Sequence, residues 1–387
     1  MFKLNSNNKI IEHLLDKLED KELKIYYNYL KKSNIKLDKL EYKKITSNKI
    51  LNPVKKMPVE WWYFTGHLKD ENNNDYGFEY CFFKFHPQSL RIGPLPLSLI
   101  KKKPFLVLHF AITDIKNNKY YTFQESGLIH KNKINYNELS LNLNKSQLIL
   151  ENKIKNKFPR FKIKNKNKKT SINLDLKPIK KLIKHYKTGY LKMYNKPIHK
   201  TYYLSFPRIK TKGTIIINNK ELKVSGESWF DHQKLNMPHK SPVLGWDWFS
   251  IMLDNKTEIM FFTLRDKKGL NHKHMGGTLI KENSKTIDLK QEDVKIINTK
   301  TWTSEKTKIT YPSEWIFKIN KLNLELKIIP TISNQEFNGK ITTQIIYWEG
   351  SCNVINNKTQ KNIGKAYIEL AGYDKRLITK IMKINYD

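Results

Sequence analysis

The sequence is poor in cysteine, glycine and proline, and it lacks long apolar runs. Two Cys in 387 residues exclude a disulfide scaffold and any zinc site built from four Cys. Fifteen Gly and 14 Pro are too few for a collagen-like or low-complexity chain. No stretch of about 18 apolar residues occurs, so no membrane-spanning helix is predicted. A globular protein remains, and its length indicates two domains.

Arginine is also scarce, although the chain is strongly basic. It has 72 Lys and Arg against 36 Asp and Glu, a formal charge of +36, but only five of the basic residues are Arg. Arg is the residue that makes bidentate contacts with phosphate and guanine. The Lys are spread along the whole chain beside abundant Asn and Ile. We therefore interpret the charge as compositional bias and expect no nucleic-acid partner.

The amino-terminal region predicts a short helical extension. Residues 1–8 are polar and lack the apolar segment of a signal peptide, which favours a cytoplasmic location. Apolar residues then recur at steps of three and four over residues 9–32, the spacing of an amphipathic helix. Such a helix can pack on the protein's own surface, which we favour, or make a peripheral contact with an anionic membrane. The extension is assigned to residues 1–52.

From Glu60 onward the sequence is typical of an all-β protein. Short runs rich in Trp, Tyr, Phe, Ile and Thr alternate with polar turns, without helical patterns between them. This predicts an antiparallel meander that closes into a barrel and so leaves no exposed edge. The length suits two barrels, and residues 234–244, which carry two Pro and no strand pattern, are the predicted linker. The predicted barrels span residues 53–236 and 237–387.

Acids and histidines inside aromatic runs are the candidates for chemistry. Asp231 and His232 follow Trp229 and Phe230, and Asp247 lies between two Trp. A carboxyl group surrounded by aromatic side chains loses solvation, which raises its pKa and lets it act as a general acid near neutral pH. The alternative is that each acid is a structural partner of nearby indole and amide groups.

Other kinds of site find little support in the sequence. It contains no Gly-x-Ser-x-Gly elbow, phosphate loop or Gly-x-Gly-x-x-Gly motif. His272 and His274 form a His-x-His pair whose one nearby carboxylate is Asp266, so no metal site is predicted. Cys81 and Cys352 lie within predicted strands and are interpreted as core residues.

An ordered series of motifs resembles the AttH-like and carotenoid 1,2-hydratase-like family. The clearest are EWWYFTGHL at residues 60–68, VSGESWFDHQ at 224–233 and GWDWFS at 245–250. Further segments follow in the same order at residues 108–114, 202–214, 311–315, 347–350 and 364–373. The resemblance extends over residues 58–375. Many relatives carry an export signal that this sequence lacks, so export does not carry over.

The resemblance implies two lipocalin-like barrels of the calycin type and a cavity for a hydrophobic small molecule. It also implies a cofactor-free enzyme of the hydratase or isomerase type, acting on an alkene of isoprenoid, carotenoid or polyketide-like character. In the hydratases an aspartate protonates the alkene, and Asp231 and Asp247 are the positions that match best. A non-catalytic carrier of a lipid or pigment is the alternative.

The site hypothesis assigns a role to nine residues. Asp231 or Asp247 would donate the proton, His232 or Glu60 would orient water, and Trp rings would stabilise a carbocation by cation–π attraction. We expect these groups to meet near a barrel mouth or at the junction of the two barrels. The catalytic candidates are Asp231, Asp247 and His232, and the substrate-binding candidates are Glu60, Trp62, Tyr203, Trp229, Trp246 and Trp248.

Overall fold

The fold is described from a computed structural model. It describes residues 48–55, 57–86, 91–92, 95–96, 104–128, 133–151, 158–167, 169–193, 200–236, 243–266 and 274–374. The predicted helix over residues 9–32 and the two Pro of the predicted linker lie outside these residues. Among the residues described, no helix is long and apolar enough to cross a membrane.

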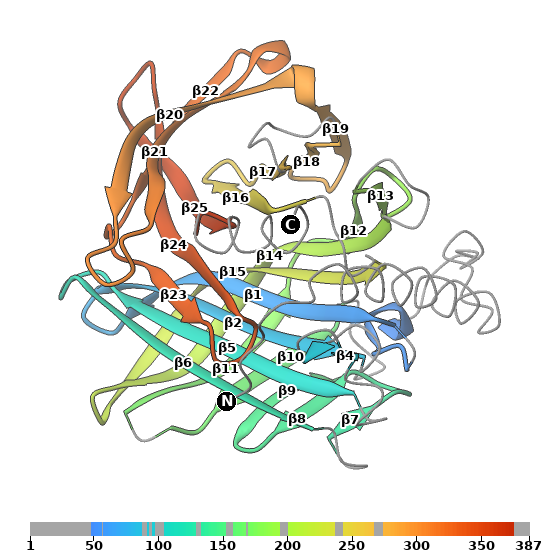
Figure 1. Cartoon of the computed structure of the whole chain (residues 1–387). Coiled ribbons are helices and arrows are strands. Elements are labelled where there is room, and N and C mark those ends of the chain that lie inside the picture. The colour runs from blue at the N-terminus through green and yellow to red at the C-terminus, as the bar shows by residue number, and fades with distance from the viewer. Residues whose placement is uncertain are drawn as a thin grey trace, which may run out of the picture.

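The first half of the chain forms one strongly curved, antiparallel sheet (Figure 1). Its strands pair in the order β6-β5-β2-β1-β15-β14-β11-β10-β9-β8-β7, with β12 and β13 added beside β14. A 3-10 turn, η1 (Asn48–Leu51), precedes it, and β3 (Arg91–Ile92) and β4 (Leu95–Pro96) form a separate small hairpin. The strands are β1 (Val59–Asp70), β2 (Asp75–Phe85), β5 (Phe105–Asp114), β6 (Lys119–Leu128), β7 (Ile134–Asn135), β8 (Ser140–Leu143), β9 (Ser146–Glu151), β10 (Arg160–Asn165), β11 (Thr170–Pro178), β12 (Ile183–Lys184), β13 (Tyr190–Lys192), β14 (Lys200–Ile217) and β15 (Lys220–Asn236).

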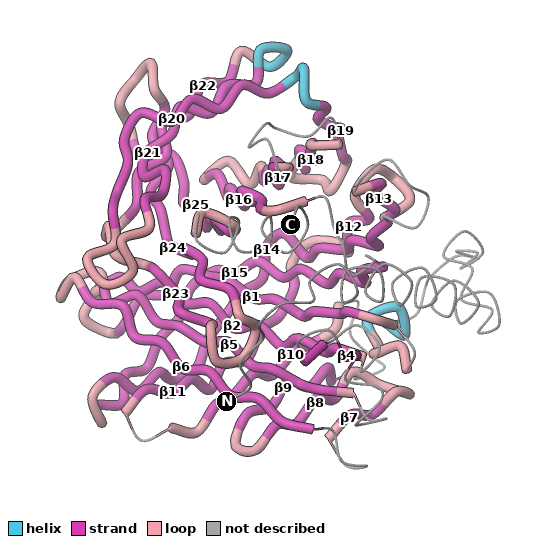
Figure 2. Tube along the Cα trace, viewed as in Figure 1, coloured by secondary structure: helices cyan, strands magenta, loops and turns pink. Residues whose placement is uncertain are grey.

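The second half forms a second curved sheet, which lies over one face of the first (Figure 1). Its strands pair in the order β19-β18-β17-β16-β25-β24-β22-β21-β20, with β23 beside β24. Figure 2 shows that strands and their turns make up nearly all of both layers, so the predicted all-β fold is confirmed. The elements are β16 (Gly245–Leu253), β17 (Glu258–Arg265), β18 (Gly276–Ile280), β19 (Thr286–Lys290), η4 (Gln291–Asp293), β20 (Val294–Thr303), β21 (Thr310–Ile319), η5 (Asn320–Leu322), β22 (Leu324–Pro330), β23 (Glu336–Gly339), β24 (Ile345–Asn356) and β25 (Asn362–Ala371).

The alternation of side chains along each strand produces three apolar layers. In β1, Trp62 and Phe64 point into the core of the first sheet, whereas Tyr63 points to the opposite face. In β16, Phe249 enters the core of the second sheet and Trp248 points away from it. The side chains that point away from the two cores meet between the sheets, where β1 contacts β25 and β2 contacts β24.

A buried ionic cluster ties the two sheets together. Glu258 of β17 accepts from Arg208 Nε of β14 at 2.6 Å and from Lys180 Nζ, in the connection between β11 and β12, at 2.5 Å. The Glu258 side chain is fully buried, and those of Lys180 and Arg208 are nearly so. Arg208 also donates from Nη2 to the Leu253 carbonyl at 2.7 Å. Arg208 also pairs with Glu227 of its own sheet, but both cations that neutralise the buried Glu258 come from the first half of the chain, so the cluster holds the sheets in one relative position.

Candidate active site

The space between the two sheets is filled by aromatic and aliphatic side chains. They come from β1, β2, β12, β13, β14 and β15 of the first sheet and from β16, β17, β18 and β25 of the second. Burial in such a layer removes most of the solvation of an acidic group, which favours its neutral form. The buried members are Tyr63, Cys81, Ile183, Leu191, Tyr203, Trp229, Trp248, Met252, Met260, Phe262, Leu264, Ile280 and Tyr367.

Four acids project into this layer, two from each sheet. They are Glu79 of β2, Asp231 of β15, Glu349 of β24 and Glu369 of β25, and we call them the acid cluster. The first three are at most 2% exposed. Within the described part of the chain, no Lys or Arg forms an ion pair with any of the four. The acid cluster therefore lies in an apolar layer without compensating cations, inside a protein whose formal charge is +36.

Asp231 is held by three donors. The hydroxyl groups of Tyr203 and Ser205 donate to its two carboxyl oxygens, and Trp229 Nε1 donates to Oδ1 at 2.6 Å. Trp248 Nε1 in turn donates to the Tyr203 hydroxyl at 2.7 Å, so this contact reaches across the boundary between the sheets. Burial raises the pKa of Asp231 to about 7, against the lowering effect of the three hydrogen bonds. Asp231 can thus exist in both protonation states near neutral pH.

Glu79 and Glu349 form a carboxyl pair across the boundary. Their side chains share a hydrogen bond, the Tyr347 hydroxyl lies 2.8 Å from Glu79 Oε1, and the Tyr63 hydroxyl donates to Glu349. Burial raises the pKa of Glu79 to about 8, and burial together with the charge of Glu79 raises that of Glu349 well above its usual range. Two adjacent buried carboxyl groups cannot both ionise, so the pair retains a proton at neutral pH.

Glu369 is the most accessible member of the acid cluster. Burial raises its pKa to about 7, against a hydrogen bond from Trp246, and the charge of Asp231 adds to the rise. Its side chain is half-buried, as are Trp61, Phe83 and Trp246, which border the same apolar layer. A small molecule that enters the layer from this side would meet Glu369 and aromatic rings.

Three buried histidines, His67, His109 and His185, are neutral, and each contacts a hydroxyl group of the second sheet. Burial lowers the pKa of each to about 3. His185 contacts the Ser205 hydroxyl through Nε2 at 2.7 Å and Thr278 Oγ1 through Nδ1 at 2.9 Å. Ser205 therefore links Asp231 to a neutral imidazole.

We expect the free energy of unfolding to decrease as the pH rises from about 6.5 to 8. A carboxyl group with a raised pKa keeps a proton in the folded protein that the unfolded chain has lost. Its stabilising effect is complete below about pH 4 and disappears as the pH rises through the folded pKa, about 8 for Glu79 and about 7 for Asp231 and Glu369. The expected loss is about 2–3 kcal/mol, measured by urea unfolding at the two pH values.

The histidines confine this decrease to the range above pH 6.5. Their pKa values are lowered, so the unfolded chain binds the protons and stability increases with pH from about 3 to 6.5. Below pH 6.5 the two effects oppose each other, and above it the acids act alone. Glu79→Gln should remove part of the decrease. A stability that is flat or rises between pH 6.5 and 8 would contradict the raised pKa values.

Five of the nine residues predicted for the site meet between the sheets. Tyr203, Trp229 and Trp248 line the layer around Asp231, and Trp246 adjoins Glu369. Tyr203 and Trp248 come from different sheets, as the expected meeting at the junction requires. Their proposed roles in binding and catalysis stay predictions.

The other four predicted residues lie elsewhere, so the expected convergence of all the groups is wrong. Because successive side chains of a strand point to opposite faces, His232 points away from Asp231 and stacks on Trp62 with ring centroids 4.8 Å apart. Asp247 likewise points away from Trp248 and pairs with Arg265 and the Tyr373 hydroxyl. Trp62 donates from Nε1 to the Leu51 carbonyl at 2.8 Å. Glu60 forms a fully buried ion pair with Lys84 at 2.7 Å.

Three members of the acid cluster were not among the predicted site residues. Glu79, Glu349 and Glu369 each directly follow a large apolar residue inside a strand that has few charged residues. A single acid in such a run is a detectable signal, because an ionised side chain is rarely buried without a partner. Glu349 lies in one of the family-like segments, next to Trp348.

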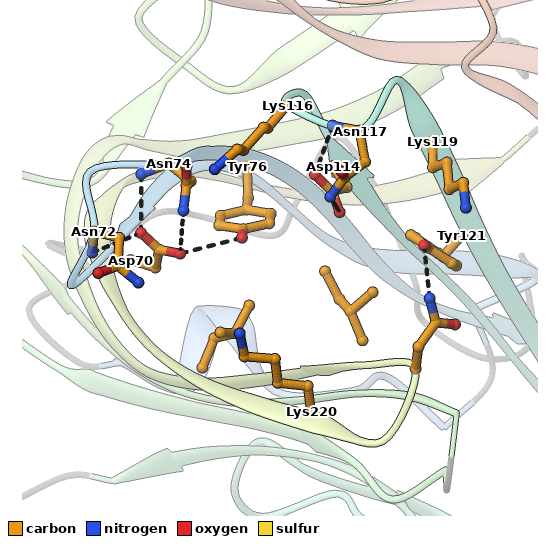
Figure 3. Close-up of a pocket in the computed structure, with 13 residues that line it drawn as sticks. Asp70, Asn72, Asn74, Tyr76, Asp114, Lys116, Asn117, Lys119, Tyr121 and Lys220 are labelled. Atoms are coloured by element: carbon orange, nitrogen blue, oxygen red, sulfur yellow. Dashed lines mark hydrogen bonds between the residues drawn. The ribbon is translucent and has the colours of Figure 1, made fainter.

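A separate cavity of about 490 Å³ lies at one end of the first sheet (Figure 3). Its carboxylates already accept hydrogen bonds within their own turns: Asp70 from Asn72, Asn74 and Tyr76, and Asp114 from Asn117. None of the predicted site residues lines it. We therefore place the candidate active site at the acid cluster.

Comparison with known proteins agrees with this architecture. The AttH-like family matches residues 49–373.

A candidate AttH from Nitrosomonas europaea has 21% identity and a TM-score of 0.75, covering 86% of this chain and 98% of its own. Kievitone hydratase from Nectria haematococca has 15% identity and a TM-score of 0.65, covering 84% and 92%. CghA, solved with Sch210972, has 7% identity and a TM-score of 0.50, covering 81% and 88%. No curated protein matches. The structural matches show the fold, so the lipocalin-like architecture is confirmed.

Proposed function

Because this chain belongs to the AttH-like family, we propose that it is a cofactor-free hydratase or isomerase that protonates an alkene-bearing hydrophobic substrate between its two sheets. One observation carries this proposal: the acid cluster combines raised pKa values with an aromatic wall and no paired cation among the described residues. A neutral carboxylic acid in an apolar site is a proton donor suited to an alkene. That one neighbour in fold is a hydratase, kievitone hydratase, supports this reaction type.

In the proposed reaction Asp231 is the proton donor. The C=C bond takes the carboxyl proton, which leaves a carbocation on the substrate and a carboxylate on Asp231. The aromatic faces of Trp229 and Trp248 stabilise the cation. The Asp231 carboxylate is in turn stabilised by hydrogen bonds from Tyr203, Ser205 and Trp229, donors that were already in place before the transfer.

Glu369 is the proposed base of the second step. It is half-buried and lies near Asp231, whose charge acts on it. In a hydration, water adds to the cation and its extra proton passes to the Glu369 carboxylate. In an isomerisation, the same carboxylate removes a proton from a carbon next to the cation. Both routes require Asp231 to be neutral and Glu369 ionised, which pKa values of about 7 permit.

A carrier of a lipid or pigment is the second candidate function. It is favoured by the completeness of the hydrogen bonds around Asp231, since an acid with three donors can be purely structural. In a carrier the same layer would bind an apolar ligand and leave it unchanged.

Incubation with isoprenoid and polyketide-like alkenes in D₂O separates the two functions. An enzyme should yield a product with one deuterium on a former alkene carbon, detected by mass spectrometry. A hydratase should also incorporate ¹⁸O from labelled water, whereas an isomerase should not. Recovery of every bound alkene without deuterium would contradict the enzyme and support the carrier. Heat-denatured protein is the control.

A further inference from the structure

A chain of hydrogen bonds runs from the acid cluster to the outside of the molecule. It starts at Glu79 Oε1, 2.8 Å from the Tyr347 hydroxyl, which lies 2.8 Å from His109 Nδ1. His109 Nε2 lies 2.7 Å from Thr342 Oγ1, and Thr342 lies 2.7 Å from Gln124 Oε1. Glu79 and His109 are fully buried, whereas Thr342 and Gln124 are half-buried. Every link is within hydrogen-bond distance.

The outer end of the chain fixes where its protons lie. Gln124 donates from Nε2 to the Asn338 carbonyl at 2.7 Å, so its Oε1 is the atom that faces Thr342. Thr342 has a single hydroxyl proton, and it points to Gln124 Oε1 at 2.7 Å in preference to the Gly339 carbonyl, which is 3.3 Å away. Thr342 then accepts from His109 Nε2, and His109 Nδ1, which is bare in a neutral imidazole, accepts from Tyr347.

The same reasoning fixes the protonation state of Glu79, at the inner end of the chain of hydrogen bonds. Once the Tyr347 proton points to His109, the bond between Tyr347 and Glu79 requires a proton on Glu79. All the contacts are satisfied only when Glu79 is a neutral carboxylic acid. When Glu79 is ionised, every bond between it and Thr342 is reversed, and Gln124 Oε1 faces a threonine oxygen without a proton between them.

We infer that Tyr347, His109 and Thr342 form a proton relay that recharges Glu79 from solvent. A hydronium ion gives its proton to Thr342 Oγ1 and becomes water. The threonine proton passes to His109 Nε2, the Nδ1 proton passes to Tyr347, and the Tyr347 proton passes to Glu79. The relay ends with neutral Glu79 and with each proton in the place derived above. This inference goes beyond the proposed function, in which Asp231 and not Glu79 gives the proton to the substrate.

The packing around the relay holds its central ring in place. The His109 ring packs against Phe337, with 4.5 Å between centroids, and lies 5.8 Å from the Tyr347 ring, which itself packs against Phe337 at 5.2 Å. Phe83 contacts it edge-on at 5.2 Å. His109 thus transfers a proton by gaining one at Nε2 and losing one from Nδ1, and its ring does not need to rotate. Since it does not touch the substrate in the proposed mechanism, it is a positioning residue.

Exchange of the Glu79 carboxyl proton for deuterium tests the relay without a substrate. The folded protein is mixed rapidly with D₂O, and the carboxylic acid C=O band of Glu79, identified by its loss in Glu79→Gln, is followed by infrared spectroscopy. Thr342→Val removes the outer hydroxyl and should slow the exchange on the order of a hundredfold, within the range for a positioned proton-transfer group. His109→Phe should have a similar effect, and Thr342→Ser should keep the wild-type rate.

His185→Phe is the matched control, because it removes a buried histidine that contacts two hydroxyl groups but lies beside Asp231. It should leave the exchange at Glu79 unchanged. Equal rates in wild type and Thr342→Val would overturn the relay, as would a wild-type spectrum with no protonated Glu79. If His109→Phe does not fold, the exchange rates of Thr342→Val and Thr342→Ser are sufficient to test the relay. Failure to find turnover, with exchange slowed as expected, would reject the proposed function and leave the relay standing.

Discussion

Asp231→Asn is expected to reduce the turnover of an alkene substrate by about 10²–10⁴-fold, the usual contribution of a general acid. Asparagine keeps the shape of the side chain and an oxygen that can accept from Trp229, but it cannot give a proton to carbon. Because Asp231 is at most 2% exposed, water cannot readily take its place. The measurement is the rate of product formation under the conditions in which deuterium incorporation is detected.

Asp247→Asn is the matched control for this prediction. It is the same chemical change at the other aspartate to which the family resemblance points, but this side chain is paired with Arg265 and Tyr373 on the opposite face of β16. We expect most of the turnover to remain. Full activity in Asp231→Asn, or its loss in Asp247→Asn alone, would transfer the role of proton donor away from Asp231.

Glu60→Gln is expected to lower the free energy of unfolding by about 3–5 kcal/mol, the cost of breaking a buried ion pair. Glu60 and Lys84 are fully buried with 2.7 Å between Oε2 and Nζ, and Lys234 is nearly buried beside them. Glu60 also accepts from the backbone amide of Val54 at 3.0 Å, which holds the chain before β1. Without this carboxylate, two buried ammonium groups lose their counter-charge. Urea unfolding of the purified variant measures the loss.

An exposed pair provides the control for Glu60. Glu282 and Lys256 lie 2.9 Å apart, with side chains 65% and 61% exposed. Glu282→Gln should leave stability nearly unchanged, because solvent already screens this pair. Adding Lys84→Met to Glu60→Gln should recover part of the loss. If Glu60→Gln is as stable as the wild type, Glu60 is not the structural counter-ion described here.

The alternation of residue types along the sequence was sufficient to predict the strands and part of the site. Tyr203 and Asp231 belong to β14 and β15, which form one long hairpin, and Trp229 shares a face with Asp231 because the two are two residues apart. Their proximity follows from alternation and from the turn at Asn218–Asn219. The same alternation separates His232 from Asp231, which the sequence interpretation left open by allowing a bend in the strand.

The acid cluster itself depends on pairings that local pattern does not reveal. Glu79 meets Glu349, which is 270 positions further along the chain, because β2 and β24 face each other from different sheets. The face that Asp247 presents follows from the register of β16 against β25, and a shift of one residue would exchange it with Trp248. Sheet-on-sheet contacts of this kind are set by the packing of both halves and by no motif within either.

The order of strands along the chain has a consequence for biosynthesis. β1 pairs with β15, so the first sheet can close as soon as residue 236 has left the ribosome. Glu349 and Glu369, however, lie on β24 and β25, the last strands described. A nascent or truncated chain can therefore contain a complete first sheet while half of the acid cluster is missing. Under the proposed function, a chain that lacks the final hairpin also lacks Glu349 and Glu369, and we expect it to be inactive however well its first half has folded.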